Sequence, residues 1–298
     1  MSRLSLEILL KRIYILQQAE IVFAAIKILR NIIMLKFTFP GPGADVSYHN
    51  HSDMSDGAAP LELMCRAAKA AGLREFGMSD HWVIPPDNSI DASSWRMKPD
   101  RLDEYIEKLL KLKKELDSEN FTLRLGLEID FFFENYREVL KNLESYPLDY
   151  TIGSVHYSGN FPVDHSINDW ITLTEEQKDN ICNIYWEKLE GAAACGLYTF
   201  IGHLDLPKKF GVIDNSRYLP CAIKVLNAAA KTQGAIELNT AGWFKECNEQ
   251  YPCSDMLKEA CALKIPVVVN ADAHHQDHVK RSFAEAAQIL EKSGYPAR

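Results

Sequence analysis

The stretch IPVVVNADAH at residues 265–274 decides the fold class, because a β-branched apolar run is followed at once by a polar Asp-Ala-His end. Apolar runs of about four to eight residues that are rich in Val and Ile predict buried strands. Six segments nearer the N-terminus have the same character. The seven predicted strands are 44–49, 74–79, 122–128, 149–155, 198–203, 234–239 and 265–271.

Helical patterns alternate with these strands. Such alternation predicts a parallel sheet with helices outside it, either open or closed into a barrel. Neither GxGxxG nor GxxxxGK[ST] occurs in the sequence, so the nucleotide-binding versions of this architecture lose their main support. The fold class is therefore α/β. The predicted helices are 60–72, 100–117, 174–196, 216–233 and 253–264.

The composition is typical of a globular protein, and the charge balance limits the classes of partner that the protein can bind. Hydrophobic residues make up 47% of the 298 residues and charged residues 25%, which excludes disordered and collagen-like chains. The 33 basic and 41 acidic side chains give a formal charge of −8 with no basic stripe, so we expect no nucleic-acid partner. Seven cysteines form no Cys-x-x-Cys pair, which indicates reduced thiols in a cytoplasmic protein. The sequence predicts no particular oligomeric state.

Residues 1–43 are predicted to form a helical extension that is dispensable for catalysis, ahead of a catalytic barrel at 44–298. Charged side chains interrupt the apolar segment 4–36 before it reaches the roughly 18 residues that a membrane span needs, so we expect no membrane association. The segment also lacks the features of a secretory signal. Two alternatives stay open for it: a packing or association helix, or an upstream extension whose natural start is Met34.

Potential metal ligands stand at or just after the carboxyl ends of six of the seven predicted strands. In a (β/α) barrel the active site is built at that face from several strand ends. The sixth strand ends differently, in Glu237-Leu238-Asn239-Thr240, which is polar but contains no histidine. The candidate ligands are His49, His51, His81, Glu128, His156, His203, Asp272 and His274, with Asp56 in the loop after the first strand.

The pair His49 and His51 has a geometric reason, since residues i and i+2 of a strand point to the same side and can bind one ion. Asp272 and His274 repeat that spacing. Each candidate alone is better explained as a core histidine, a cap or a paired carboxylate. Six imidazoles and three carboxylates together exceed the needs of one tetrahedral zinc, which favours several ions. We expect Asp80 to face away and to orient or cap, not to bind metal.

Together these motifs resemble the polymerase and histidinol phosphatase (PHP) superfamily over about residues 44–298. The stretches GLEIDFF, GSVHYSGNFPVD, IGHLDLPKKFG and IELNTAGW are further similar to the histidinol-phosphatase branch. The motifs that carry the resemblance are HxH followed by SDG (49–57), SDH (79–81), GLE (126–128), GSVHY (153–157), IGHLDL (201–206) and DAH (272–274).

The resemblance implies a distorted seven-stranded (β/α) TIM-like barrel with a trinuclear centre of zinc, manganese or iron, held by the nine residues named above. It also implies a metal-dependent phosphomonoesterase that converts L-histidinol phosphate and water to L-histidinol and phosphate in histidine biosynthesis. A hydroxide held on the ions is the expected nucleophile, because clustered divalent ions activate water and neutralise phosphate oxygens. The alternatives are a PHP phosphoesterase for another small phosphate or a nucleotide end, and a non-catalytic PHP module. The complete ligand set argues against the module.

The sequence departs from the branch at two arginines. The branch commonly carries these arginines in a GLRK and a DAHR stretch, where they can hold the substrate phosphate. Here Phe244 and His275 stand at the two arginine positions. The predicted substrate-binding residues are Lys245, Lys208, Lys209 and His275, although a lysine does not reproduce the two-pronged grip of a guanidinium. For Lys208 and Lys209 a role as surface residues is equally open.

Overall fold

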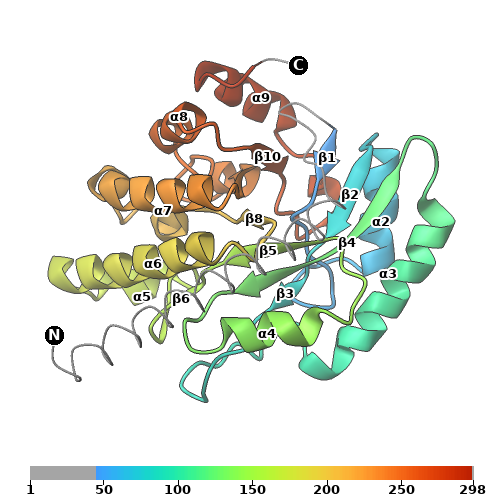
Figure 1. Ribbon diagram of the computed structural model, residues 1–298, viewed down its shortest axis with the longest axis horizontal. Helices are drawn as coiled ribbons and strands as arrows, with labels where there is room; N and C mark the ends of the chain where they lie inside the picture. Colours follow the sequence, from blue (N-terminus) through green and yellow to red (C-terminus); the bar gives the residue numbers. More distant parts are fainter. Residues whose placement is uncertain (1–44, 297–298) are drawn as a thin grey trace, which may run out of the picture. The chain divides into compact units, whose positions relative to one another are not determined.

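Seven parallel strands form the central sheet of residues 45–296, the part of the chain that the structure, a computed structural model, describes (Figure 1). The predicted extension at 1–43 lies outside these residues. Each of these seven strands overlaps a segment that the sequence predicts as a strand, whereas a further short strand beside them, β3 (His81–Trp82), was not predicted. In order across the sheet the strands are β1 (Val46–Ser47), β2 (Glu75–Met78), β4 (Thr122–Asp130), β5 (Tyr150–Ser154), β8 (Phe200–Ile201), β9 (Ala235–Asn239) and β10 (Val267–Asn270).

The sheet curls until its first and last strands meet, which makes a nearly closed barrel. The backbone N–H of His51 donates to the carbonyl of Ala273 over 2.9 Å, and Asn50 and Ala273 form a parallel bridge. The N–H of Tyr48 donates to the side-chain oxygen of Asn270 over 2.8 Å. The ends of the barrel sequence therefore lie side by side, and the barrel predicted by the resemblance is confirmed.

One predicted strand boundary is wrong at β4. The prediction ends this strand at Glu128, whereas β4 continues to Asp130 because it is paired on both sides there. On one side lies the short strand β3 (His81–Trp82), with His81 opposite Glu128, and on the other lies β5, with Ser154 opposite Asp130. Glu128 is therefore held inside the sheet and not in a loop after it.

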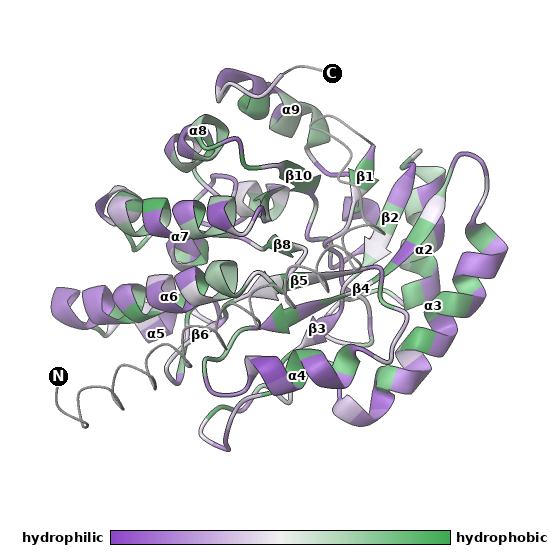
Figure 2. Cartoon of the chain, viewed as in Figure 1, coloured by the Kyte–Doolittle hydropathy of each residue, from purple (hydrophilic) through white to green (hydrophobic). Residues whose placement is uncertain are grey.

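Helices surround the strands (Figure 1) and match the predicted ranges to within a few residues. Figure 2 shows hydrophobic residues along β10 and many hydrophilic ones on the outer helices α3 and α6. No helix within residues 45–296 combines the length and the apolar character that a membrane crossing requires. The predicted helices appear as α2 (Leu61–Ala70), α3 (Leu102–Leu116), α6 (Glu175–Cys195), α7 (Leu219–Lys231) and α8 (Ser254–Ala262).

Several further elements were not predicted. They include helices, a two-stranded antiparallel hairpin and 3-10 turns, most of them too short to give a clear periodic signal. These elements are α4 (Tyr136–Leu143), α5 (Ile167–Ile171), α9 (Phe283–Lys292), β6 (Tyr157–Ser158), β7 (Phe161–Pro162), η1 (Pro99–Arg101), η2 (Leu206–Phe210), η3 (Asn215–Tyr218), η4 (Thr240–Phe244) and η5 (Gln276–His278).

Tyr150 fills the barrel interior next to the strands that lead into the site. Its ring lies against Gly77 and Gly126, where an added Cβ would come within 2.2 Å and 2.1 Å of Tyr150 atoms. Its hydroxyl donates to the carbonyls of Tyr48 over 2.5 Å and Met78 over 3.0 Å. Two glycines thus admit one large ring, whose hydroxyl ties Tyr48, the residue before the candidate ligand His49, to the end of β2.

Candidate metal centre

All nine predicted metal ligands meet at the carboxyl ends of the barrel strands. They form four overlapping groups, and within each group the candidate ligand atoms lie within 4.8 Å of one another. Within residues 45–296 these groups contain no residue outside the predicted nine. The groups are His51, Asp56, His81 and His274; His49, Glu128 and His203; His49, His51 and Asp272; and His81, Glu128 and His156.

Glu128 lies at the middle of these groups and is fully buried. Its Oε2 atom is 2.7 Å from Nδ1 of His81 and 3.2 Å from Nε2 of His49. Its Oε1 atom is 2.9 Å from Nε2 of His203 and 3.6 Å from Nε2 of His156. Because each carboxylate oxygen faces its own set of imidazoles, Glu128 is suited to bridge two ions.

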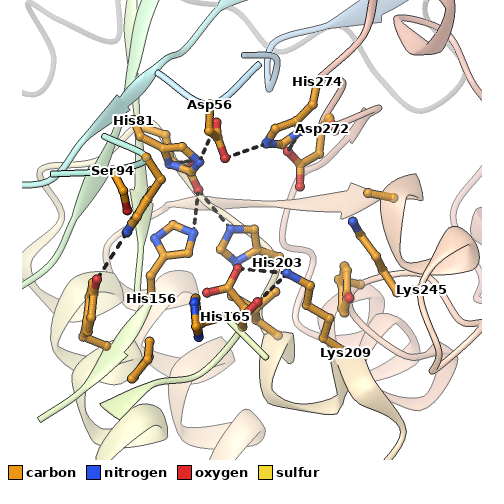
Figure 3. Close-up of a pocket in the computed structure, with 18 of the residues that line it drawn as sticks. Asp56, His81, Ser94, His156, His165, His203, Lys209, Lys245, Asp272 and His274 are labelled. Carbon is orange, nitrogen blue, oxygen red and sulfur yellow. Dashed lines mark hydrogen bonds and ion pairs between the residues drawn. The ribbon is translucent and has the colours of Figure 1, made fainter. Parts of the chain in front are cut away.

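Asp56 and His274 lie on the more open side of the centre. The two oxygens of Asp56 are 3.5 Å from Nε2 of His81 and 3.3 Å from Nε2 of His274 (Figure 3). The loop that carries Asp56 turns tightly at Gly57, where a Cβ would lie 2.7 Å from backbone atoms of His51. A glycine is required there to bring the Asp56 carboxylate back over the histidine pair.

Asp272 contributes from the other side of the barrel seam with a strained backbone. Its φ angle is +47°, in the left-handed region that residues other than glycine seldom adopt. Its Oδ1 atom lies 3.2 Å from Nε2 of His51 and 3.7 Å from Nε2 of His49. The amide of Asn239 donates to its Oδ2 atom over 3.0 Å. Strain of this kind persists where surrounding contacts hold a functional side chain in place.

The residues present fit metal ions, because the centre leaves several buried polar atoms without a hydrogen bond. A buried polar atom left unpaired costs about 1–3 kcal/mol, so native structures rarely gather several in one place. Ions between these atoms would satisfy them at once. Among the described residues the unpaired atoms here are Nε2 of His49, both ring nitrogens of His51, Nδ1 of His81, Oε2 of Glu128 and Nδ1 of His203.

Burial and neighbouring charges shift the pKa values of the candidate ligands in different directions. Burial and the neighbouring His81 lower the pKa of His51 to about 3. Burial alone would raise the pKa of Glu128, but His49 and His81 hold it well below its usual range. Burial likewise disfavours a charged His49, yet the carboxylate of Glu128 raises its pKa well above the ordinary value. An ionised Glu128 and a neutral His51 are the forms that bind metal ions.

Two carboxylates that the sequence did not single out orient the candidate ligands. Glu237 accepts from Nδ1 of His49 over 3.0 Å, and Asp130 accepts from Nδ1 of His156 over 2.5 Å. Such contacts fix the imidazole so that Nε2 points at the ions. The sequence could have identified Asp130, because its i+2 spacing from Glu128 puts both side chains on one face of β4.

Asp80 lies outside the four groups and holds the loop between His51 and Asp56. It accepts hydrogen bonds from the backbone N–H and the hydroxyl of Ser52, both over 2.8 Å. It also accepts from the N–H of Ser55 over 3.2 Å and from its hydroxyl over 2.6 Å. Its contacts are those of an orienting residue.

A pocket of about 850 Å³ opens over the centre and contains three of the four predicted substrate-binding residues, Lys209, Lys245 and His275. Figure 3 shows Lys209 and Lys245 on the side of the pocket where His203 lies. Nζ of Lys209 lies 2.6 Å from the carbonyl oxygen of Asp164 and 3.2 Å from its carboxylate. Lys245 is exposed. The pocket also contains Arg281, a cation that is not among the predicted substrate-binding residues.

Lys208 matches neither of the two roles open for it. It is only 3% exposed, so it is no surface residue, and it does not line the pocket. Its ammonium group lies 2.9 Å from Asp205 and 2.6 Å from Glu249 and donates to the carbonyl of Gln250 over 2.7 Å. These buried contacts occupy all three of its donors, which removes it from the substrate-binding candidates.

The comparison with known proteins matches the part of the chain that carries most of the candidate ligands. Residues 47–241 match the PHP domain family. A Deinococcus radiodurans protein named "Probable histidinol-phosphatase" is 38% identical over 231 residues, which cover 77% of this chain and 85% of that protein. The chain belongs to the PHP family. The Bacillus subtilis protein named "Histidinol-phosphatase" is 26% identical over 242 residues, or 75% of this PHP chain and 90% of that protein.

A solved structure shares the fold. The histidinol phosphate phosphatase of Lactococcus lactis, complexed with zinc, L-histidinol and phosphate, matches with a TM-score of 0.72 at 22% identity. The match covers 84% of this chain and 94% of that one. The predicted PHP resemblance is confirmed, and the buried clusters of this PHP barrel support binding of divalent metal ions.

Proposed function

We propose that this PHP chain is a metal-dependent histidinol-phosphatase, which hydrolyses L-histidinol phosphate to L-histidinol and phosphate. The observation that carries the proposal is the convergence of nine donors, Glu128 among them, from six strand ends into four overlapping groups beside a pocket with cations on its wall. The relatives named above, with 38% and 26% identity, support the substrate.

Three divalent ions of zinc, manganese or iron would share the four groups, because Glu128, His49, His51 and His81 each belong to two of them. Mixed imidazole and carboxylate donors suit these metals. When bound, such ions activate water for attack and neutralise the oxygens of the phosphoryl group. The chain's own part is to fix the donors, which Glu237, Asp130 and Asp80 do through the contacts described above.

The pocket wall offers a place for the rest of the substrate. The rings of Trp95 and Tyr157 lie 6.1 Å apart and nearly parallel, and Trp95 also contacts the rings of His81 and His156 edge-on. An aromatic wall beside the centre suits stacking with the imidazole of histidinol phosphate.

Phosphate release from a panel of substrates tests the proposal. The metal-loaded protein is assayed with L-histidinol phosphate, with other small phosphomonoesters and with nucleotide ends. We expect the highest kcat/KM for L-histidinol phosphate. A preference for another phosphomonoester would show a PHP phosphoesterase of different specificity, and no hydrolysis of any substrate by protein with its full metal content would support the non-catalytic module.

A further inference from the structure

Three cations line the pocket, and they differ in what already neutralises them. Lys209 is bound to the carbonyl and the carboxylate of Asp164. Lys245 is exposed on a flexible stem. Arg281 is half-buried, and among residues 45–296 no side chain forms an ion pair or a hydrogen bond with its guanidinium. Of these three cations, Arg281 is the one that is partly buried and still has no anionic partner bound to it within the described part of the chain, so its guanidinium is available to bind a ligand.

A ring holds this guanidinium in place. The central carbon of the Arg281 guanidinium lies 3.7 Å from the centroid of the Phe244 ring, which is stacking distance. Phe244 ends the turn η4, and the first residue of that turn, Thr240, donates its hydroxyl to the backbone carbonyl of Arg281 over 2.9 Å. Two contacts therefore fix the position of Arg281 while leaving its N–H groups free to donate.

We propose that Arg281, stacked on Phe244, binds the phosphoryl group of the substrate and takes over the role of the two arginines that the sequence lacks. Phe244 stands at one of those two positions and serves as the platform for an arginine that comes from a different loop. The inference rests on the proposed function, since it assigns the phosphate grip of the same site.

The environment of Arg281 fits an anion. Burial lowers the pKa of its guanidinium, and only the carboxylate of Asp272 opposes that effect. A partly buried, unpaired charge is costly, and a phosphate removes the cost with two charge-assisted hydrogen bonds. Asp272 is also a candidate ligand, so a phosphate held by Arg281 would lie beside the centre where hydrolysis occurs.

Binding of inorganic phosphate to the metal-loaded, full-length protein tests the proposal. Arg281→Gln should weaken phosphate binding, measured by calorimetric titration, about ten- to hundredfold. The phosphate affinity of Arg281→Lys should lie between those of the wild type and Arg281→Gln, because lysine keeps the positive charge but cannot donate two parallel hydrogen bonds as a guanidinium does. Phe244→Leu should weaken binding about two- to fivefold through loss of the stacking platform. Arg217→Gln is the matched control, since Arg217 is an exposed arginine paired with Asp179 outside the pocket.

Metal content is measured on every variant. Weaker phosphate binding by Arg281→Gln at unchanged metal content supports the proposal. Unchanged phosphate affinity overturns it, and so does loss of metal from both Arg281 variants, because Arg281 would then support the centre itself. If the wild type does not hydrolyse L-histidinol phosphate but Arg281→Gln still weakens phosphate binding, the proposed function fails and the assignment of Arg281 stands.

Discussion

The carboxylate of Glu237, in the middle of strand β9, accepts a hydrogen bond from Nδ1 of His49, which follows strand β1, over 3.0 Å. Its other oxygen accepts from the backbone N–H of His203 over 2.7 Å. A single buried side chain therefore sets the position of two candidate ligands. With Nδ1–H donated to Glu237, the His49 ring keeps its Nε2 lone pair for the centre.

Replacing Glu237 tests this orienting role. Glu237→Gln keeps the shape of the side chain but removes the charge, so we expect metal affinity to fall about 10- to 100-fold while the fold persists. Competition with a metal chelator measures the affinity, and circular dichroism measures the fold. Glu246→Gln, at an exposed glutamate, is the control. Equal affinities in the two variants would mean that Glu237 does not orient His49.

Removing the histidine pair tests the metal centre. The wild-type protein, purified without chelator, should retain more than one equivalent of transition metal per chain. Combined His49→Ala and His51→Ala should lower that content and abolish phosphatase activity, because both residues belong to two donor groups. Elemental analysis of the double variant decides. The control is His165→Ala with His278→Ala, whose side chains belong to none of the four groups and whose loss should leave metal content unchanged.

The turn at Gly57 predicts a steric effect. In Gly57→Ala the new Cβ would approach the His51 backbone to 2.7 Å, so the loop must shift and take Asp56 with it. We expect a loss of about 1–3 kcal/mol in the free energy of unfolding and lower activity. Gly234→Ala, whose Cβ would meet its neighbours at 3.5 Å or more, should be tolerated. Denaturant unfolding of both variants measures the difference, and equal stabilities would contradict the tight turn.

Restoring the arginines of the family branch separates two views of the pocket. If Arg281 binds the phosphate, Phe244→Arg should lower kcat/KM for L-histidinol phosphate about fivefold or more, because the stacking platform is lost and a second positive charge is placed beside the first. His275→Arg leaves the platform intact and should not share that loss. Steady-state kinetics on the two variants tests this. A gain in kcat/KM for Phe244→Arg would instead show that phosphate binding is weak in the wild type because the arginine at this position is missing.

A protein that begins at Met34 tests the proposed domain boundary. All nine donors lie between His49 and His274, within the barrel proposed for 44–298. We expect this shortened protein to fold and to keep its phosphatase activity and metal content, since a barrel of about 250 residues is self-sufficient. Repeated insolubility, or activity lost from soluble protein, would assign the preceding segment to the barrel core or to an assembly interface.

The order of strands and helices and the placement of the nine donors at strand ends were predictable from local patterns, whereas closure of the sheet into a barrel was implied by the family resemblance. A β-branched run such as 265–271 predicts a strand wherever it lies, and a polar residue at its end falls at the catalytic face by the topology of the barrel. The sequence also predicted that Asp80 would not be a ligand. These inferences need no knowledge of which side chains meet.

The errors concern residues whose role depends on a distant partner. A lysine is usually found at the surface, but the ammonium group of Lys208 is buried, where the carboxylates of Asp205 and Glu249 neutralise its charge. Arg281 was overlooked because its importance comes from what it lacks, a partner, and from the ring of Phe244, which lies in another loop. Pairing across the fold is set by tertiary packing, which no local pattern reveals.

The seam between Asn50 and Ala273 has a consequence for how the protein is made. The ribosome releases His49 and His51 early, whereas Asp272 and His274 emerge only after almost the whole barrel has been synthesised. A nascent chain can therefore expose imidazoles long before it can enclose an ion. The complete donor set therefore exists only once the last strand of the barrel has been made, and a chain cut short before Asp272 would carry seven of the nine donors.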